Sequence, residues 1–288
     1  MRAERPAGPA ASSGVSATGR RPGAPGGSRW VLRLLAVAYV CVLVVLPLVV
    51  MVGRTFEDGV AAFVESVTSP EAVAAVTLSL QVAVQAVVVN TVFGVAVSLL
   101  ITRYRFRGRS VLNALIDLPV SVSPVIAGLA LILVYGSNGW FGGFLQAAGI
   151  QVIYSVPGIV LATCFVSLPL VVRELVPVLD EIGLEQEQAG RSLGANAWQR
   201  LWRLTLPSVR WALAYGVVLS LARALGEFGA VRVVAGNVLG STQTMPLLAA
   251  QRYADLDESG AYAISFVMVA IAILCIIVVA LLRPRDHH

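Results

Sequence analysis

Few side chains in this sequence are suited to making or breaking covalent bonds. All 21 basic residues are arginines, so there is no lysine for a nucleotide-binding P-loop or a Schiff base. The two histidines are His287 and His288, which excludes HExxH zinc sites and histidine general-base catalysis. Cys41, Cys164 and Cys275 lie far apart inside apolar stretches, as small buried side chains commonly do. The sequence therefore predicts no catalytic residue and no metal site.

A charged pair inside an apolar run is the first candidate for function. Arg223 and Glu227 are four residues apart, and such a pair lowers the cost of placing either charge in lipid. Two interpretations stay open: a buried structural pair, or a pair that faces a translocation pathway. Gly226, Gly229 and Gly236 would let neighbouring helices approach closely.

Two prolines mark a second candidate, in the stretch 117–128. Pro119 and Pro124 are five residues apart, which weakens a helix and frees backbone carbonyls. Ser121 and Ser123 lie between them and could satisfy the freed groups. Such a break at membrane depth is tolerated where it lines a cavity or the protein interior. The stretch is therefore either a simple kink or part of a pathway.

A third candidate is the polar segment 177–208. Acidic residues come first, apolar residues recur at helical spacing, and Gly194 interrupts them. The following stretch, with Trp198 and Trp202, is amphipathic. The segment is either a helix at the lipid interface or a short helix presented to a soluble partner. Periodicity alone does not decide between them.

Composition places these candidates in a membrane. The chain has 288 residues, a hydrophobic share of 57% and a charged share of 13%, too little charge to cover a soluble domain. The mean hydropathy is +0.82. We predict an all-α integral membrane protein in contact with lipid, with about six transmembrane helices. The predicted spans are 30–52, 72–102, 111–135, 155–176, 209–234 and 260–282.

Charge distribution predicts the orientation of these spans. Arginines gather in both tails and in the loops after the second and fourth spans, whereas acidic residues gather in the opposite loops. This bias puts both termini in the cytoplasm of a multi-pass protein of the cell membrane. The net charge of +5 follows from these flanking arginines, and nucleic-acid binding is not expected. Residues 1–28, rich in Gly, Pro, Ser and Ala, are predicted to be a disordered cytoplasmic tail that is not cleaved.

One face of the second predicted span is polar. Thr77, Gln81 and Gln85 are four residues apart, and Asn90 and Gly94 follow them. A polar stripe should face protein or water rather than lipid. It either joins this helix to another helix or lines a pathway.

The segment from Gly194 to Pro207 resembles the EAA loop of the membrane subunits of bacterial ABC importers. The resemblance rests on a glycine, nine further residues, Leu204, and then Thr-Leu-Pro. The usual Glu-Ala-Ala aligns with Gln188-Ala189-Gly190, and Glu187 stands one position early. In that family the loop docks into a cleft of the ATPase subunit. The residues that the resemblance implies for coupling are Glu187, Gln188, Ala189, Gly190, Gly194, Leu204 and Pro207.

Two further stretches resemble the sulfate and molybdate permeases of the same group. The run Arg223-Ala-Leu-Gly-Glu-Phe-Gly-Ala matches their RxxGEFGA signature, and the proline-containing stretch 117–128 resembles the sulfate permeases. Matches at 135–139, 169–177, 210–219 and 244–247 favour the CysW-type branch over the CysT-type branch. The residues implied for a pathway or gate are Arg223, Gly226, Glu227, Phe228, Gly229, Ser121, Ser123 and Pro124.

The resemblance covers about residues 30–283 and implies a type I ABC importer permease fold, with a core at about 72–282. It implies a subunit without cofactors of its own, which pairs with a CysT-type permease or a second copy. Two cytosolic ATPase subunits would bind ATP and magnesium, and an extracytoplasmic sulfate-binding protein would deliver the anion. Sulfate, thiosulfate, molybdate and tungstate stay open as substrates. The alternatives are a secondary anion transporter, which would show paired broken helices in two repeats, and an intramembrane enzyme.

Overall fold

The computed structural model describes residues 26–282, and every regular element within that range is a helix. The chain divides into two units, residues 1–49 and residues 50–288, which are described separately. The predicted tail of residues 1–28 lies outside the described residues except for its last three, which begin the first helix.

The first unit holds most of one long apolar helix. It runs as α1 (Gly26–Val40), a wider π-turn η1 (Cys41–Val45) and α2 (Leu46–Thr55), which crosses into the second unit. In the wide turn the Leu46 N–H donates to the carbonyl of Cys41, five residues back. Pro47 comes next, and a proline crowds the carbonyl four residues before it. The extra residue in the turn relieves that crowding, so the first predicted span is present as a continuous helix.

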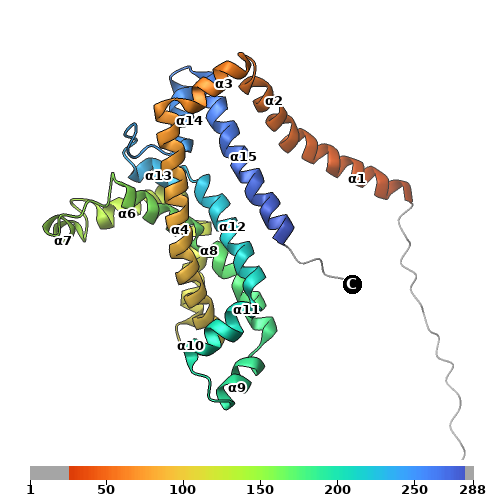
Figure 1. Ribbon diagram of the computed structural model, residues 1–288, viewed down its shortest axis with the longest axis vertical. Helices are drawn as coiled ribbons and strands as arrows, with labels where there is room; N and C mark the ends of the chain where they lie inside the picture. The colour runs from red at the N-terminus through yellow and green to blue at the C-terminus, as the bar shows by residue number, and fades with distance from the viewer. Residues whose placement is uncertain (1–25, 283–288) are drawn as a thin grey trace, which may run out of the picture. The chain divides into compact units, whose positions relative to one another are not determined.

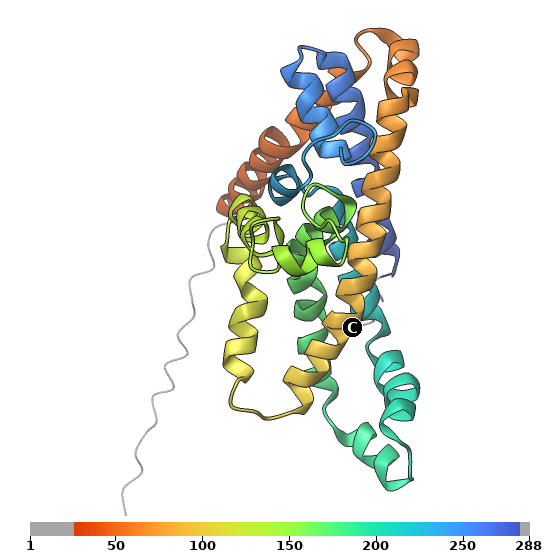
Figure 2. The ribbon, with the colours of Figure 1, turned by 90° about the vertical axis from the view of Figure 1, so that its left-hand side faces the viewer.

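The second unit is a bundle of helices (Figures 1 and 2). After the end of α2 its elements are α3 (Gly59–Thr68), α4 (Pro70–Arg103), α5 (Arg109–Ser121), α6 (Pro124–Tyr135), α7 (Gly142–Ala147), α8 (Val156–Ile182), α9 (Glu185–Ser192), α10 (Ala197–Arg200), η2 (Leu201–Thr205), α11 (Leu206–Ser208), α12 (Arg210–Leu225), α13 (Gly229–Val234), α14 (Met245–Ala254) and α15 (Glu258–Leu282). Within this unit α3 and α14 lie at one end, α9 and α10 at the other, and α6, α7 and α13 on one side (Figure 1).

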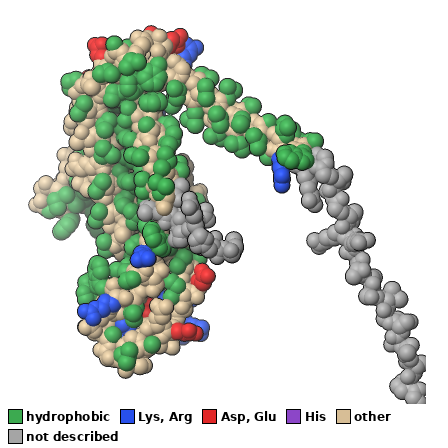
Figure 3. Space-filling view, turned by 45° about the vertical axis from the view of Figure 1, so that its right-hand side comes forward, with side chains coloured by type: hydrophobic (Ala, Val, Ile, Leu, Met, Phe, Trp, Pro, Cys, Tyr) green, Lys and Arg blue, Asp and Glu red, His purple; other side chains and the backbone are tan. Residues whose placement is uncertain are grey.

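The surface of this unit is that of a membrane protein. On the face shown in Figure 3, hydrophobic side chains form a broad band, and charged side chains gather at its two ends. Among the described residues of both units, four helices are long and apolar enough to cross a membrane, and two bent pairs bring the number to as many as six. The second, fourth and sixth predicted spans correspond to α4, α8 and α15. The fourth is longer than predicted, because α8 continues through Pro177 to Ile182 and takes the first residues of the predicted loop 177–208.

The core of the bundle is the contact between α4 and α8, which run in the same direction. Halfway along, the amide of Asn90 on α4 donates to the Cys164 carbonyl (3.2 Å) and the Ser167 hydroxyl (2.8 Å) of α8. Gly94 follows one turn later, where α8 presents Val171. A buried amide with partners and a glycine at a close approach fix the register of the two helices.

Two predicted spans are broken rather than straight. The third, 111–135, stops at Ser121 and restarts at Pro124 as α6, bent by 115°. The fifth, 209–234, ends at Leu225, and residues 229–234 form the separate helix α13. The 115° bend between α5 and α6 is more than the simple kink that the prolines alone would suggest. The third predicted span is therefore a bent pair of helices, and the fifth is shorter than predicted.

The glycine at 94 gives a test of the α4–α8 packing. A Cβ at this position would lie 2.7 Å from Cγ1 and 2.9 Å from Cβ of Val171. We expect Gly94→Ala to destabilise the purified protein by about 1–3 kcal/mol, because overpacking a buried contact forces the helices apart. The loss would appear as a lower thermal unfolding midpoint in detergent. Gly143→Ala in α7 is the matched control, since no atom lies within 4 Å of its Cβ position; an equal loss in both variants would contradict this account.

Candidate functional site

The predicted charged pair is present at the break between α12 and α13. Arg223 Nη1 lies 2.7 Å from Glu227 Oε2, and the Glu227 side chain is 2% exposed whereas that of Arg223 is 39% exposed. The contact is an ion pair rather than an aligned hydrogen bond. The other carboxylate oxygen accepts the backbone N–H of Ala230, 2.9 Å away, at the start of α13. The buried charge of Glu227 is therefore paired with Arg223, and its second oxygen satisfies an N–H at the open start of α13.

The two helix breaks lie against each other. A Cβ on Gly229, the first residue of α13, would be 3.0 Å from Cβ of Pro124, the first residue of α6. Further along, a Cβ on Gly128 would be 2.9 Å from the carbonyl oxygen of Ala230. Only glycine allows this approach of two backbones. The fold thus brings together five of the predicted pathway residues, Pro124, Gly226, Glu227, Phe228 and Gly229, with Arg223 beside them.

The two serines of the break are not used as the sequence suggested. The hydroxyls of Ser121 and Ser123 make no hydrogen bond to any described residue, and both side chains are exposed. The backbone carbonyl of Ser123 instead accepts the N–H of Ala127 and so begins α6. The expectation that these hydroxyls satisfy the carbonyls freed by the prolines is wrong.

The segment after α8 is a chain of short helices at the opposite end of the unit from α14 (Figure 1). Gly183 and Gly194 have positive φ angles of +70° and +83° and bracket α9. Asn196 begins α10 with a capping box, in which its side chain and that of Gln199 each bond to the other's backbone. The predicted interruption at Gly194 is therefore a turn that a residue with a Cβ adopts only under strain.

The second part of this segment leads into α12 through another wide turn. In η2 the Leu206 N–H donates to the Leu201 carbonyl, and Pro207 follows. The pattern repeats the one before Pro47. Trp198 and Trp202 lie on the preceding face as an edge-to-face pair, 5.5 Å apart between ring centres, and both are more than half exposed. A large exposed aromatic pair of this kind marks a surface for lipid or a partner protein.

The predicted coupling residues divide into exposed and enclosed ones. Gln188, Ala189 and Pro207 are exposed. Gly190 lies against Leu204, whose Cδ1 would be 2.8 Å from a Cβ at this position.

Glu187 is held inside the protein. It forms an ion pair with Arg103, a residue that the sequence analysis did not single out. No local pattern could have found this pair, since its members are 84 positions apart.

Another ion pair was also missed. Arg173 of α8 donates to Asp117 of α5 through Nε at 3.0 Å and Nη2 at 2.8 Å, and both side chains are about half exposed. The signal was an arginine and an aspartate in separate apolar spans, each needing a partner. The pair joins α5 to α8 just before the break that leads to α6.

The polar face of α4 is divided in the structure. Asn90 and Gly94 face α8, as described above, whereas Thr77, Gln81 and Gln85 are exposed. The Thr77 hydroxyl donates to the Val73 carbonyl of its own helix. Within the described part of the chain, the two glutamine amides have no hydrogen-bond partner. Among the described residues, Thr77, Gln81 and Gln85 thus do not join α4 to another helix by hydrogen bonds.

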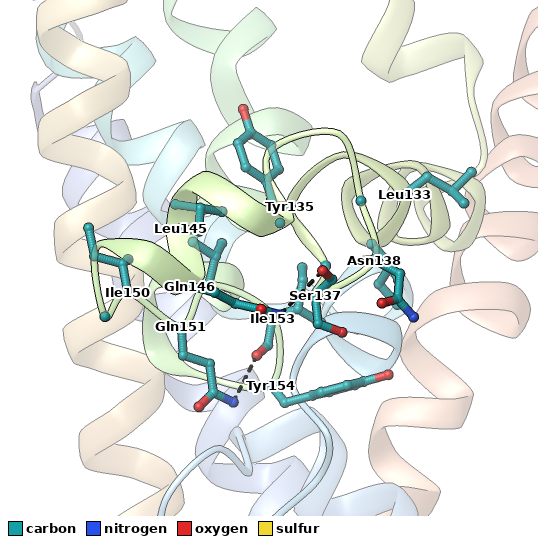
Figure 4. A pocket seen from close by; sticks show the side chains of 16 residues that line it. Leu133, Tyr135, Ser137, Asn138, Leu145, Gln146, Ile150, Gln151, Ile153 and Tyr154 are labelled. Carbon is teal, nitrogen blue, oxygen red and sulfur yellow. Dashed lines mark hydrogen bonds between the residues drawn. The ribbon is translucent and has the colours of Figure 1, made fainter.

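A cavity lies elsewhere, in the connection between α6 and α8. It has a volume of about 550 Å³ and is lined by residues between Ile132 and Tyr154 (Figure 4). Gln146 donates to the Ser137 carbonyl, and Gln151 donates to the Ile153 carbonyl. The lining has no charged side chain and none of the predicted pathway residues.

The arrangement offers charge pairing and helix breaks rather than bond chemistry. Among residues 26–282, no group of three His, Cys, Asp or Glu side chains is placed to hold a metal ion. The geometry is that of a bundle of apolar helices with a chain of short helices at one end.

Comparison with known proteins gives a consistent result. Residues 90–286 match the family model described as "Binding-protein-dependent transport system inner membrane component". The chain is 42% identical over 260 residues to the sulfate transport system permease protein CysW of Synechocystis sp., covering 90% of this chain and 94% of that protein. It is 39% identical to the sulfate transport system permease protein CysT of Escherichia coli (strain K12), covering 86% and 89%.

A solved structure is similar in fold. The crystal structure of a bacterial alginate ABC transporter, in complex with an alginate pentasaccharide-bound periplasmic protein, contains a chain that superposes with a TM-score of 0.72. The two chains are 16% identical, and the match covers 88% of this chain and 92% of that one. The helix order and the broken spans thus belong to a known membrane architecture.

The buried carboxylate of Glu227 allows a double-mutant test of the pair. Arg223→Gln would leave a charge that is 2% exposed without its partner, so we expect it to cost more stability than Arg223→Gln combined with Glu227→Gln. The coupling energy should be about 1–3 kcal/mol, measured from thermal unfolding of the purified variants in detergent. If the stability losses of Arg223→Gln and Glu227→Gln simply add in the double variant, the two residues do not act as a pair.

Proposed function

The chain belongs to the family of binding-protein-dependent transport system inner membrane components, and we propose that it is a membrane subunit of an ATP-driven importer of sulfate. The observation that carries this proposal is the α9–α11 segment. It presents exposed side chains at one end of the bundle in a chain that has no lysine with which to bind a nucleotide. Energy would have to come from another protein docked on this segment.

The orientation in the proposal follows from arginine. The end of the second unit that carries α9–α11 also holds the α4–α5 loop, with Arg105 and Arg107. Positive loops are retained in the cytoplasm, so we propose that this end and both termini are cytoplasmic. The end with α3 and α14 would then face outward.

The partners of the proposed importer follow the same logic. Two ATPase subunits would bind ATP and magnesium and contact α9–α11, so this chain itself would hydrolyse nothing. A homologous CysT-type permease, or a second copy, would cover faces that this chain leaves open, such as the α4 stripe with Gln81 and Gln85. A sulfate-binding protein would dock on the outer end; the alginate transporter of similar fold was solved in complex with a periplasmic protein.

The substrate is proposed from the relatives and from the charges. Both relatives quoted above are named for sulfate transport. An anion pathway requires that carboxylates within the membrane be neutralised, and Glu227 is paired with the partly exposed Arg223. Arg223 keeps further N–H donors for an oxyanion. Thiosulfate, molybdate and tungstate share the tetrahedral oxyanion chemistry.

An uptake assay tests the function. The chain would be produced with its sister permease, ATPase and binding protein in cells that lack other sulfate uptake. We expect labelled sulfate to accumulate only when the ATPase subunit is present, and an excess of thiosulfate or molybdate to show which oxyanions compete. Accumulation without any ATPase subunit would instead support a secondary anion transporter, and no uptake of any oxyanion would refute the proposal.

The turn at Gly194 gives a prediction for coupling. Gly194 has φ +83° and no atom within 4 Å of its Cβ position, so the constraint is the backbone angle rather than space. We expect Gly194→Val to insert normally but to lower sulfate uptake at least tenfold, because β-branched residues are strained at this angle. Gly194→Asn is the matched control, since asparagine adopts positive φ more readily. Normal uptake by the valine variant would count against the docking role of this turn.

A further inference from the structure

A largely buried ion pair ties the α9–α11 segment to two long helices. Arg103 is the last residue of α4, and its Nε lies 2.9 Å from Glu187 Oε1 of α9. Its Nη1 also donates to the Leu179 carbonyl in the last turns of α8, at 3.0 Å. The arginine side chain is 9% exposed and that of the glutamate 22%. One guanidinium therefore holds the ends of α4 and α8 to the same point of α9.

Glu187 passes this connection on to the second part of the segment. The same oxygen, Oε1, accepts the hydroxyl of Thr205 in η2 at 3.1 Å. Thr205 is buried and lies two residues before Pro207. The carboxylate thus joins four elements: α4 and α8 through Arg103, its own helix α9, and η2 through Thr205.

The other connections of α9 are weaker. Gly183 and Gly194 stand at its two ends with positive φ, and no atom lies within 4 Å of either Cβ position. Such residues leave the backbone free to turn. Beyond Arg103 and Thr205, the side-chain contacts that the structure describes for α9 include the packing of Leu204 and Arg200 on Gly190 and a long 3.4 Å hydrogen bond between Ser208 and Gln186. Without its ion pair, α9 could pivot between the two glycines.

We infer that the Arg103–Glu187 ion pair is the connection through which movement of the α9–α11 segment reaches α4 and α8. This inference rests on the proposed function. A push on α9 is transmitted to the two longest helices of the unit as long as the pair stays closed. Arg103 and Glu187 are positioning residues: their loss lets the partner hydrolyse ATP without moving the helices. The inward direction of Glu187 also leaves Gln188 as the exposed neighbour available to a partner.

The test measures coupling rather than activity alone. The complete complex would be reconstituted in vesicles, and the sulfate imported per ATP hydrolysed would be compared for wild type, Arg103→Gln, Glu187→Gln and the double variant. We expect each single change to lower this ratio at least fivefold while ATP hydrolysis continues, and the double variant to match the worse single one. Arg105→Gln and Glu181→Gln are matched controls near the pair and outside the α9–α11 segment. Both residues are exposed and unpaired within the described part of the chain, and both variants should stay within twofold of wild type.

The results separate the inference from the proposed function. An unchanged ratio in the single variants would overturn the inference, as would a double variant whose loss is the product of the two single losses. If Arg103→Gln does not assemble, Glu187→Gln and the shortened Glu187→Asp decide, and the second should give an intermediate ratio. A wild-type complex that imports no oxyanion would refute the proposed function, and the inference with it. If the wild type imports sulfate and the single variants keep its ratio of sulfate imported to ATP hydrolysed, only the inference is refuted.

Discussion

Lipid offers no hydrogen-bond partners, and this constraint decides where the chain can break its helices. Both breaks within the bundle occur where another part of the chain covers them. The first residue of α13 packs on the first residue of α6, and Glu227 accepts the open N–H of Ala230 while it faces Arg223. Neither break would be stable alone at this depth, because each would expose unpaired backbone groups. The two breaks are therefore one structural unit, made from spans that are a hundred residues apart in the chain.

The charged residues within or beside the helices follow the same constraint. Arg223 pairs with Glu227 across the α12–α13 break, Arg173 with Asp117 between α8 and α5, and Arg103 with Glu187 between α4 and α9. The first pair spans a helix break, and the other two join helices that do not follow each other in the chain. The apolar contacts of α4 with α8 and α12 fix the centre of the bundle. The ion pairs add polar connections to this apolar packing.

Hydropathy predicted α4, α8 and α15 well, since these helices are set by local composition. The turn at Gly194 was also predictable, because glycine breaks a helical pattern for a local reason. The bend at 122–123 was only half predictable: Pro119 and Pro124 show where a helix is weak, but the direction of α6 depends on glycines 128 and 229 at a distant contact. The inward position of Glu187 was not predictable, because its partner Arg103 belongs to another helix. The cavity at 132–154 lies in the connection between α6 and α8, whose path the hydropathy pattern does not describe.

The two wide turns before Pro47 and Pro207 have a consequence for the surfaces that precede them. Each inserts one residue beyond a regular α-helix, and one residue corresponds to a rotation of about 100° around the helix axis. In the second case Thr205 faces inward toward Glu187, while Trp198 and Trp202 are turned to the outside. Removing a single residue between 201 and 205 would restore a regular helix and rotate the indoles of Trp198 and Trp202 about the helix axis to another face. The proline, through the extra residue in the turn before it, thus determines which face of the short helix is exposed to a neighbouring molecule.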